Sequence, residues 1–311
     1  MNGMELSKAY FEECALPVFN RELSEYIKYS AFGLVGEGSE CFELDDYISK
    51  DHDFSPSFCI WLPKRFINDA RKSVYCALNK LPASFKGYDC NIKGSLSERR
   101  GLFSIEDFYY KYTKKTDFPL NNLDWLNIPE SYLATCTNGR VFVDYYGEFT
   151  RIRNYLIDFY PEDVVKKKLS AYVAMMAQSG QYNMPRSHIR KDLDAYYFSK
   201  AEFIKNCYGA LYLLASSYKP YYKLAGKKIK DLDYYPKEIF EDINKMQGNN
   251  NFDSDIIIVE RICKYISTII SIRYNIKSED NFMIDMALKL QESIADKDLK
   301  ALHVMKGNEN A

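Results

Sequence analysis

The sequence predicts an α+β protein with two parts: a small α/β domain with a mixed sheet over residues 1–155, and an all-α helical domain over residues 156–311. Three observations support this. Short β-prone runs alternate with helical patterns up to about residue 150, and long helical patterns dominate after it. The length of 311 residues suits two domains. Hydrophobic residues make up 47% of the chain, which is enough to bury a sizeable core.

The N-terminal part should alternate between helices and strands. Its first segment, residues 6–27, has helical spacing that Pro17 is expected to kink or break. Asn138-Gly139 is a strong turn signal and leads into an alternating strand over residues 140–145. The same criteria predict strands at 31–35, 54–62 and 85–92, and helices at 64–80, 104–112 and 129–135.

The C-terminal part should form a helical bundle. Glycine and proline residues, including Gly180 and Pro185, divide its helical patterns. The predicted helices span residues 161–179, 187–217, 236–246, 255–274 and 279–296.

Composition excludes several classes of function. The chain holds 42 basic and 43 acidic side chains, and this balance argues against a duplex-DNA binder, although a local basic patch for RNA is not excluded. The eight cysteines form no CxxC pair and the three histidines are scattered, which argues against zinc. No apolar run approaches the roughly 18 residues that cross a bilayer. With no signal peptide evident, we expect a reduced, cytoplasmic protein that does not enter a membrane.

The balanced total hides two halves of opposite charge. Residues 1–150 carry a net charge of −5, and residues 151–311 a net charge of +4. Seven acids and one base lie between Glu37 and Asp53. Crowded acids repel one another unless water or a shared cation separates them.

One stretch, residues 33–63, has the residue types for binding phosphate and a cation. Gly38 permits a close approach of the backbone, and Ser39 offers a hydroxyl and a backbone N–H to a phosphate oxygen, helped by any helix that starts there. After eleven intervening residues come Asp51 and Asp53. Residues two apart in a strand face the same side, so these carboxylates would point together and suit Mg²⁺.

These residues resemble the signature of the nucleotidyltransferase superfamily related to DNA polymerase beta: a Gly-Ser after the first strand, then Asp-x-Asp at the next strand. The match covers roughly residues 30–62. The longer pattern, with GQYN at 180–183 and YKPYYK at 218–223, looks like an uncharacterised branch of that superfamily. That branch joins the catalytic domain to a C-terminal helical domain like that of aminoglycoside nucleotidyltransferases.

The resemblance implies a Mg²⁺-dependent transfer of a nucleoside monophosphate from an NTP, by default ATP, to a hydroxyl group. It assigns Gly38 and Ser39 to the triphosphate, and Asp51 and Asp53 to the metal. Asp-x-Asp also occurs at four other places, but none of these has a Gly-Ser ten to fourteen residues upstream.

The family also needs a third carboxylate on a later strand. Asp144, at the end of the predicted strand 140–145, is the first candidate as metal ligand or general base, and Glu148 is the second. A strand-end aspartate can equally accept hydrogen bonds from the N–H groups of a turn.

Many relatives carry a basic residue directly after the Gly-Ser, whereas Glu40 and Cys41 follow it here. The phosphate charge must then be met by metal or by groups elsewhere. The helical domain offers Arg186 and Arg190, four residues apart on a possible helix face, and Tyr222 with Lys223. Each of these also has a structural interpretation, as a solvated helix face or a packed turn.

The acceptor is expected to be a small hydroxylated molecule, because the helical domain resembles that of antibiotic-modifying relatives. Two alternatives stay open. In the first, the acceptor is a macromolecule, either an RNA end or a protein hydroxyl. In the second, the protein binds nucleotide without catalysis.

Overall fold

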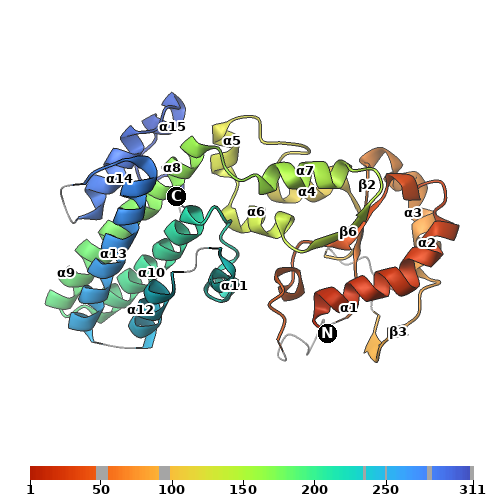
Figure 1. The fold of residues 1–311 in the computed structure, drawn as a ribbon, viewed down its shortest axis with the longest axis horizontal. Helices are drawn as coiled ribbons and strands as arrows, with labels where there is room; N and C mark the ends of the chain where they lie inside the picture. The colour runs from red at the N-terminus through yellow and green to blue at the C-terminus, as the bar shows by residue number, and fades with distance from the viewer. Residues whose placement is uncertain (47–54, 91–98, 234–235, 249–250, 279–281, 309–311) are drawn as a thin grey trace. The chain divides into compact units, whose positions relative to one another are not determined.

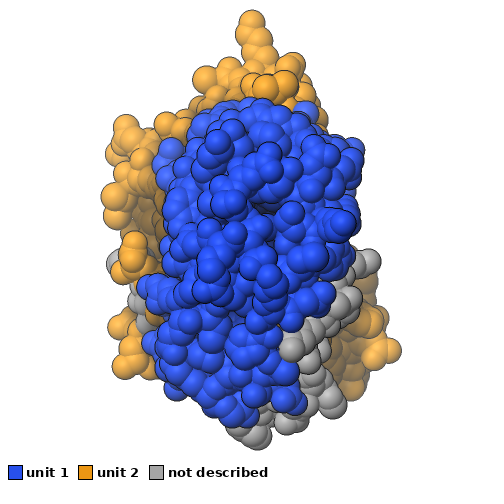
Figure 2. All heavy atoms as spheres, turned by 90° about the vertical axis from the view of Figure 1, so that its right-hand side faces the viewer, with its two compact units in different colours: residues 1–119, 131–158 blue, residues 120–130, 159–311 orange. Residues whose placement is uncertain are grey.

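A computed structural model describes residues 1–46, 55–90, 99–233, 236–248, 251–278 and 282–308. It confirms the α+β class, with a four-stranded mixed sheet in the N-terminal part and a mainly helical C-terminal part (Figure 1). The chain forms two compact units (Figure 2). Unit 1 comprises Met1–Pro119 and Ser131–Asp158, and unit 2 comprises Leu120–Glu130 and Phe159–Ala311. The sequence places one boundary at residue 155, whereas the chain passes between the units three times.

The sheet of unit 1 has the strand order β5-β2-β1-β6. Its central strand β1 (Ala31–Leu34) pairs antiparallel with both β2 (Cys59–Leu62) and β6 (Arg140–Asp144). The edge strand β5 (Gly101–Ser104) runs parallel to β2. Since all residues of β1 and β2 are buried, these strands read as continuous apolar runs in the sequence.

Helices cover both faces of this sheet. On one face Phe32 of β1 packs against Phe11 and Phe19, with ring centroids 5.1 and 5.2 Å away. On the other face Trp61 of β2 stacks on Phe149 at 4.0 Å. Figure 1 shows the helices that cover the two faces. They are α1 (Gly3–Tyr10) and α2 (Leu16–Glu22) on the first face, and α4 (Ile105–Thr113) and α7 (Glu148–Ile157) on the second. Helix α3 (Lys64–Leu78) also packs on the sheet. Helix α6 (Glu130–Thr137) precedes β6 in the chain.

The first helix does not break at Pro17. A π-helical turn, Phe11–Ala15, joins α1 directly to α2, and Pro17 lies in the first turn of α2. Proline lacks an N–H and its ring clashes with the carbonyl four residues earlier in a regular α-helix. The wider π turn absorbs this irregularity, so the backbone stays helical.

The strand predicted at 85–92 is wrong as one element. A two-stranded hairpin replaces it, with β3 (Ser84–Phe85) and β4 (Tyr88–Asp89). Lys86 and Gly87 both have positive φ, 49° and 86°, which is the geometry of a type I′ turn. The edge strand β5 was not predicted, because its four residues run directly into α4 and offer no apolar run as clear as those of β1 and β2.

Unit 2 is a helical bundle in which α8 (Glu162–Met176) continues through a π-helical segment (Ala177–Asn183) into α9 (Met184–Ile189). Gly180 and Pro185 therefore do not end helices. A Cβ on Gly180 would clash with the ring of Phe203, so the glycine allows α10 to pack closely. The other helices of the unit are α5 (Asn122–Asn127), α10 (Leu193–Leu214), α11 (Tyr222–Lys228), α12 (Lys237–Gly248), α13 (Phe252–Tyr274), α14 (Met283–Glu292) and α15 (Lys297–Ala301). Within the described ranges, none of the helices combines the length and apolarity needed to cross a membrane.

Lys167 of α8 anchors the C-terminal segment of unit 2. Its fully buried amino group donates to Gln291 Oε1 at 2.8 Å and to the carbonyl oxygens of His303 at 2.8 Å and Val304 at 3.1 Å. These acceptors carry no net charge, and burial lowers the pKa of Lys167 to about 8. Keeping the Lys167 side chain charged in the folded protein therefore costs free energy.

We expect Gly33→Ala to destabilise the protein by about 1–3 kcal/mol, the usual cost of overpacking. A Cβ on Gly33 would lie 2.5 Å from the carbonyl oxygen of Arg140 and 2.9 Å from the Cα of Val141, and both are backbone atoms of β6. The matched control is Gly248→Ala, where no atom of the described residues, apart from the chain neighbours and the helix backbone of Gly248 itself, lies within 4 Å of the new methyl group. Urea unfolding of both variants measures the difference, and equal losses of stability would contradict the packing at Gly33.

The low pKa of Lys167 gives a stability that depends on pH. Because the folded pKa of about 8 lies below the ordinary lysine value of about 10.4, the unfolded chain binds more protons between these two values. The free energy of unfolding should therefore receive a rising contribution from Lys167 as the pH increases from about 8 to about 10. Unfolding curves of wild type and Lys167→Met across this range isolate the contribution. The same slope in both proteins would show that Lys167 titrates normally.

Candidate functional site

The loop after β1 carries Gly38 and Ser39 in an irregular conformation. Gly36 and Gly38 have φ values of 118° and 124°, a region of backbone conformation that residues other than glycine rarely adopt. Ser39 opens a 3₁₀ turn of only four residues, Ser39–Phe42. The helix that was expected to assist phosphate binding at Ser39 is thus a single short turn.

Asn138 fixes the start of this loop. Its side-chain Oδ1 accepts a hydrogen bond from the Gly36 N–H, and its Nδ2 donates to the Gly36 carbonyl, each at 2.8 Å. The next residue, Gly139, packs so closely that a Cβ would clash with the carbonyl oxygen of Leu34. The Asn138-Gly139 turn, predicted as a lead into β6, therefore also holds the candidate phosphate loop.

Arg100 brings a positive charge to the loop from 60 residues further along the chain. Its guanidinium is 12% exposed, donates to the carbonyl of Glu37 at 2.8 Å, and forms an ion pair with the carboxylate of Glu40. It also lies 3.4 Å from the Sγ of Cys41. The basic side chain that is missing directly after Gly38-Ser39 in the sequence is therefore supplied by Arg100 in the folded protein.

The carboxylate of Glu37 also forms ion pairs, with two basic side chains. Lys111 Nζ lies 2.7 Å from its carboxylate and Arg99 Nε lies 3.3 Å from it. Burial alone would raise the pKa of Glu37, but the hydrogen bond from Lys111 and the charges of Arg99 and Arg100 lower it below the ordinary value. The carboxylate is thereby held in its charged form.

Cys41 does not have the properties of a nucleophile. Its side chain is 1% exposed, and burial raises the pKa of the thiol to about 12, although Arg100 lies beside it. A thiol needs to lose its proton to react. Cys41 therefore packs under the loop, whereas Ser39 is half-buried at its surface.

The predicted metal ligands Asp51 and Asp53 lie outside the described residues. Among the residues that the structure does describe, no group of three or more His, Cys, Asp or Glu side chains is arranged to hold a metal ion. The structure thus places Gly38 and Ser39 together in one loop and leaves their relation to Asp51 and Asp53 a prediction.

Asp144 lies away from the loop. It pairs with Ala31 at the start of β1, whereas Gly38 and Ser39 follow the end of β1. Its carboxylate accepts hydrogen bonds from the N–H groups of Gly147 at 2.7 Å and Thr150 at 2.8 Å, and so caps the first turn of α7. The second candidate, Glu148, is half-buried and its pKa is lowered by the hydrogen bond from Arg151.

The candidates of the helical domain do not form one cluster. Figure 1 places α9, with Arg186, and α11, with Tyr222 and Lys223, in different parts of unit 2. Arg186 donates to the hydroxyl of Tyr182 at 2.7 Å and lies over its ring, and Arg190 ends α9 as an exposed residue. Tyr222 is 70% exposed.

The GQYN sequence, residues 180–183, has an architectural role in the bundle. Gln181 Nε2 donates to Glu260 of α13 at 2.9 Å, and its Oε1 accepts from the backbone N–H of Met283 at 2.8 Å. Asn183 lines a shallow pocket of about 440 Å³ with Phe198 and other residues of α8 and α10.

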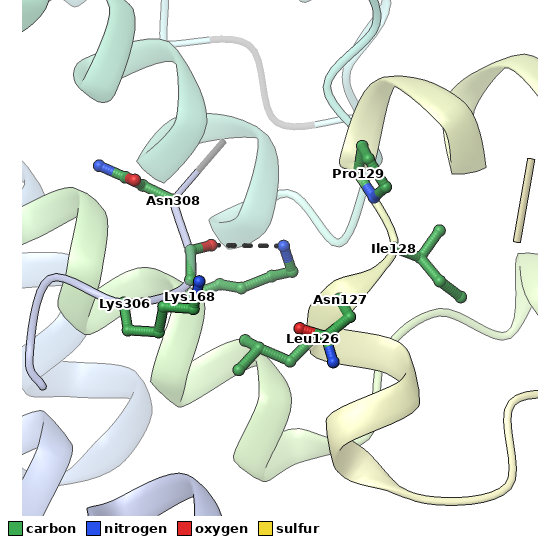
Figure 3. Close-up of a pocket in the computed structure, with 8 residues that line it drawn as sticks. Leu126, Asn127, Ile128, Pro129, Lys168, Lys306 and Asn308 are labelled. Atoms are coloured by element: carbon green, nitrogen blue, oxygen red, sulfur yellow. Dashed lines mark hydrogen bonds between the residues drawn. The ribbon is translucent and has the colours of Figure 1, made fainter. Parts of the chain in front are cut away.

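A second, smaller pocket of about 130 Å³ lies in unit 2 and contains none of the predicted site residues (Figure 3). Lys168 reaches across it to the carbonyl of Gly307 at 3.4 Å, and its amino group lies 3.7 Å from the buried carboxylate of Glu130. The remaining lining comes from two chain segments, residues 126–129 and 306–308.

The fold and the loop define an α+β protein with a candidate phosphate site in its N-terminal unit. A family model described as a domain of unknown function (DUF4037) matches residues 125–224. This match spans β6 and α7 of unit 1 and α8 to α10 of unit 2, and it does not include the stretch from Gly38 to Asp53. No curated protein and no solved structure matches the chain.

We expect Asp144→Ala to lower the free energy of unfolding by about 1 kcal/mol, because it removes the cap of α7. Asp144→Asn retains one acceptor oxygen and should lose less. Glu148→Gln is the control on the same turn, since its exposed pairing with Arg151 contributes little. Denaturant unfolding of the three variants gives the values. An alanine variant as stable as wild type would contradict the capping role.

Proposed function

We propose that the protein is a Mg²⁺-dependent nucleotidyltransferase that transfers a nucleoside monophosphate from an NTP to a hydroxyl group. The observation that carries the proposal is the loop of Gly38 and Ser39. Its positive-φ glycine, its half-buried serine and the adjacent guanidinium of Arg100 form a compact set of groups suited to phosphate oxygens. This set follows the first strand of a mixed sheet, as the resemblance implies.

Each residue has a definite part in the proposal. Ser39 and the backbone beside Gly38 bind phosphate oxygens of the donor, and Asp51 and Asp53 hold Mg²⁺, which supplies positive charge to the triphosphate. The acceptor hydroxyl would attack the α-phosphorus in line, with pyrophosphate as the leaving group. Asp144 is the proposed third carboxylate and Glu148 the second candidate; Asp144 pairs with the start of β1 and caps α7, so it would act from the opposite end of that strand to the loop.

The donor is proposed to be ATP, and the acceptor a small hydroxylated molecule, both by resemblance. The helical residues Arg186, Arg190, Tyr222 and Lys223 are then candidates for contacts with substrate outside the loop. They belong to two helices, α9 and α11, which lie in different parts of unit 2 (Figure 1).

Asp53→Asn should abolish the Mg²⁺-dependent part of thermal stabilisation by ATP while leaving the unliganded melting temperature unchanged. The physical reason is that an amide oxygen replaces a charged carboxylate, which is the ligand that Mg²⁺ prefers. The matched control is Asp233→Asn, from an Asp-x-Asp pair without an upstream Gly-Ser. Persistence of the Mg²⁺-dependent stabilisation in Asp53→Asn would contradict the assignment of Asp53 as a metal ligand.

A further inference from the structure

The carboxylate of Glu40 lies where an anion would be expected to bind. The space above Gly38, which a side chain would otherwise fill, contains both oxygens of Glu40, 2.5 and 2.6 Å from the position of a Cβ on that glycine. The same carboxylate is the ion-pair partner of the Arg100 guanidinium. A glycine with positive φ and a nearby arginine thus surround a negatively charged group that the chain itself supplies.

Arg100 is held in place independently of Glu40. Its guanidinium donates to the backbone carbonyls of Arg99 and Glu37, each at 2.8 Å. These bonds orient the fork toward the loop, so that departure of Glu40 would leave the guanidinium aimed at the same position. Arginine binds phosphate as readily as carboxylate, through the same planar geometry. The Glu40 side chain is 27% exposed and so reaches solvent.

We propose that Glu40 is a built-in stand-in for a nucleotide phosphate, and that Arg100 is the phosphate-binding residue which Glu40 releases when nucleotide binds. This inference rests on the proposed function for the identity of the ligand. It explains how an acidic residue directly after Gly38-Ser39 is compatible with phosphate binding. In this arrangement the Glu40–Arg100 pair is electrically neutral before the ligand arrives, and the phosphate exchanges with Glu40 instead of adding to it.

The test compares binding of Mg²⁺–ATP and of inorganic triphosphate to the full chain in three variants: Glu40→Gln, Arg100→Lys and Glu43→Gln. Glu43 is the matched control, because it lies in the same segment and makes an equivalent ion pair, with Arg140 at 2.7 Å. Removing either acid changes the net charge equally, so any general electrostatic effect appears in both.

Glu40→Gln should bind both ligands about tenfold more tightly, the factor expected when one charged competitor is lost, whereas Glu43→Gln should stay near wild type. Arg100→Lys keeps the charge but loses the fork, and should bind about tenfold more weakly. Unliganded unfolding curves show whether each variant is folded. If Glu40→Gln does not fold, the comparison of Arg100→Lys with wild type still decides whether Arg100 contacts phosphate.

Equal affinities in Glu40→Gln and Glu43→Gln, or an unchanged affinity in Arg100→Lys, would overturn the inference. The proposed function would survive that result if Asp53→Asn still removed the Mg²⁺-dependent response. Conversely, tighter triphosphate binding in Glu40→Gln without any role for Asp53 would support the exchange and reject the nucleotidyltransferase. Absence of binding by ATP and triphosphate in every variant would reject both.

Discussion

The close approach between the end of β1 and the turn before β6 is the constraint on which the candidate site depends. Gly139 leaves no room for a Cβ against the carbonyl of Leu34, and Asn138 satisfies both backbone groups of Gly36. Arg153 of α7 in turn donates to the carbonyls of the turn. An irregular loop has few backbone hydrogen bonds of its own, so it keeps one conformation only if side chains supply them. The residues that fix the loop lie about 100 positions away in sequence, which ties the loop to completion of the sheet.

Three of the crowded acids of the N-terminal half form ion pairs within unit 1. The sequence alone suggested that water or a shared cation would separate them. Instead, distant elements of the same unit provide a partner for each of three acids. These pairs are Glu37 with Lys111 and Arg99, Glu40 with Arg100, and Glu43 with Arg140. Opposite charges at such distances offset the mutual repulsion that the spacing in sequence implies. The net charge of a sequence segment is therefore a poor measure of the electrostatic field around its loop.

The sequence was sufficient to predict the elements whose signal is local. The buried runs at β1 and β2, the Asn138-Gly139 turn and most of the long helices were predicted from residue pattern. The helix predicted over 187–217 is two helices, because Asp192 caps a new start at Leu193. The errors have tertiary causes. Pro17 and Gly180 were expected to end helices, but π-helical turns keep the backbone helical, and Gly180 is required by the ring of Phe203. At the candidate site, Gly38 and Ser39 carried a motif that could be recognised, whereas Arg100 could not be found. Its role arises only when β5 adds to the edge of the sheet beside β2.

The position of Asp144 shows why residue type and order do not suffice to assign a catalytic carboxylate. It was selected because it ends a strand that follows a turn, and that description is correct. The antiparallel pairing of β6 with β1 brings Arg140, not Asp144, to the end of β1 from which the loop departs. In a strand of five residues the two ends are separated by about 13 Å, from a rise of about 3.3 Å per residue. A carboxylate at the far end is separated from the loop by the length of the strand, and its hydrogen bonds to Gly147 and Thr150 give it a capping role. Sheet register thus limits which acids can join a phosphate-binding loop, and it is a property that spacing along one strand does not reveal.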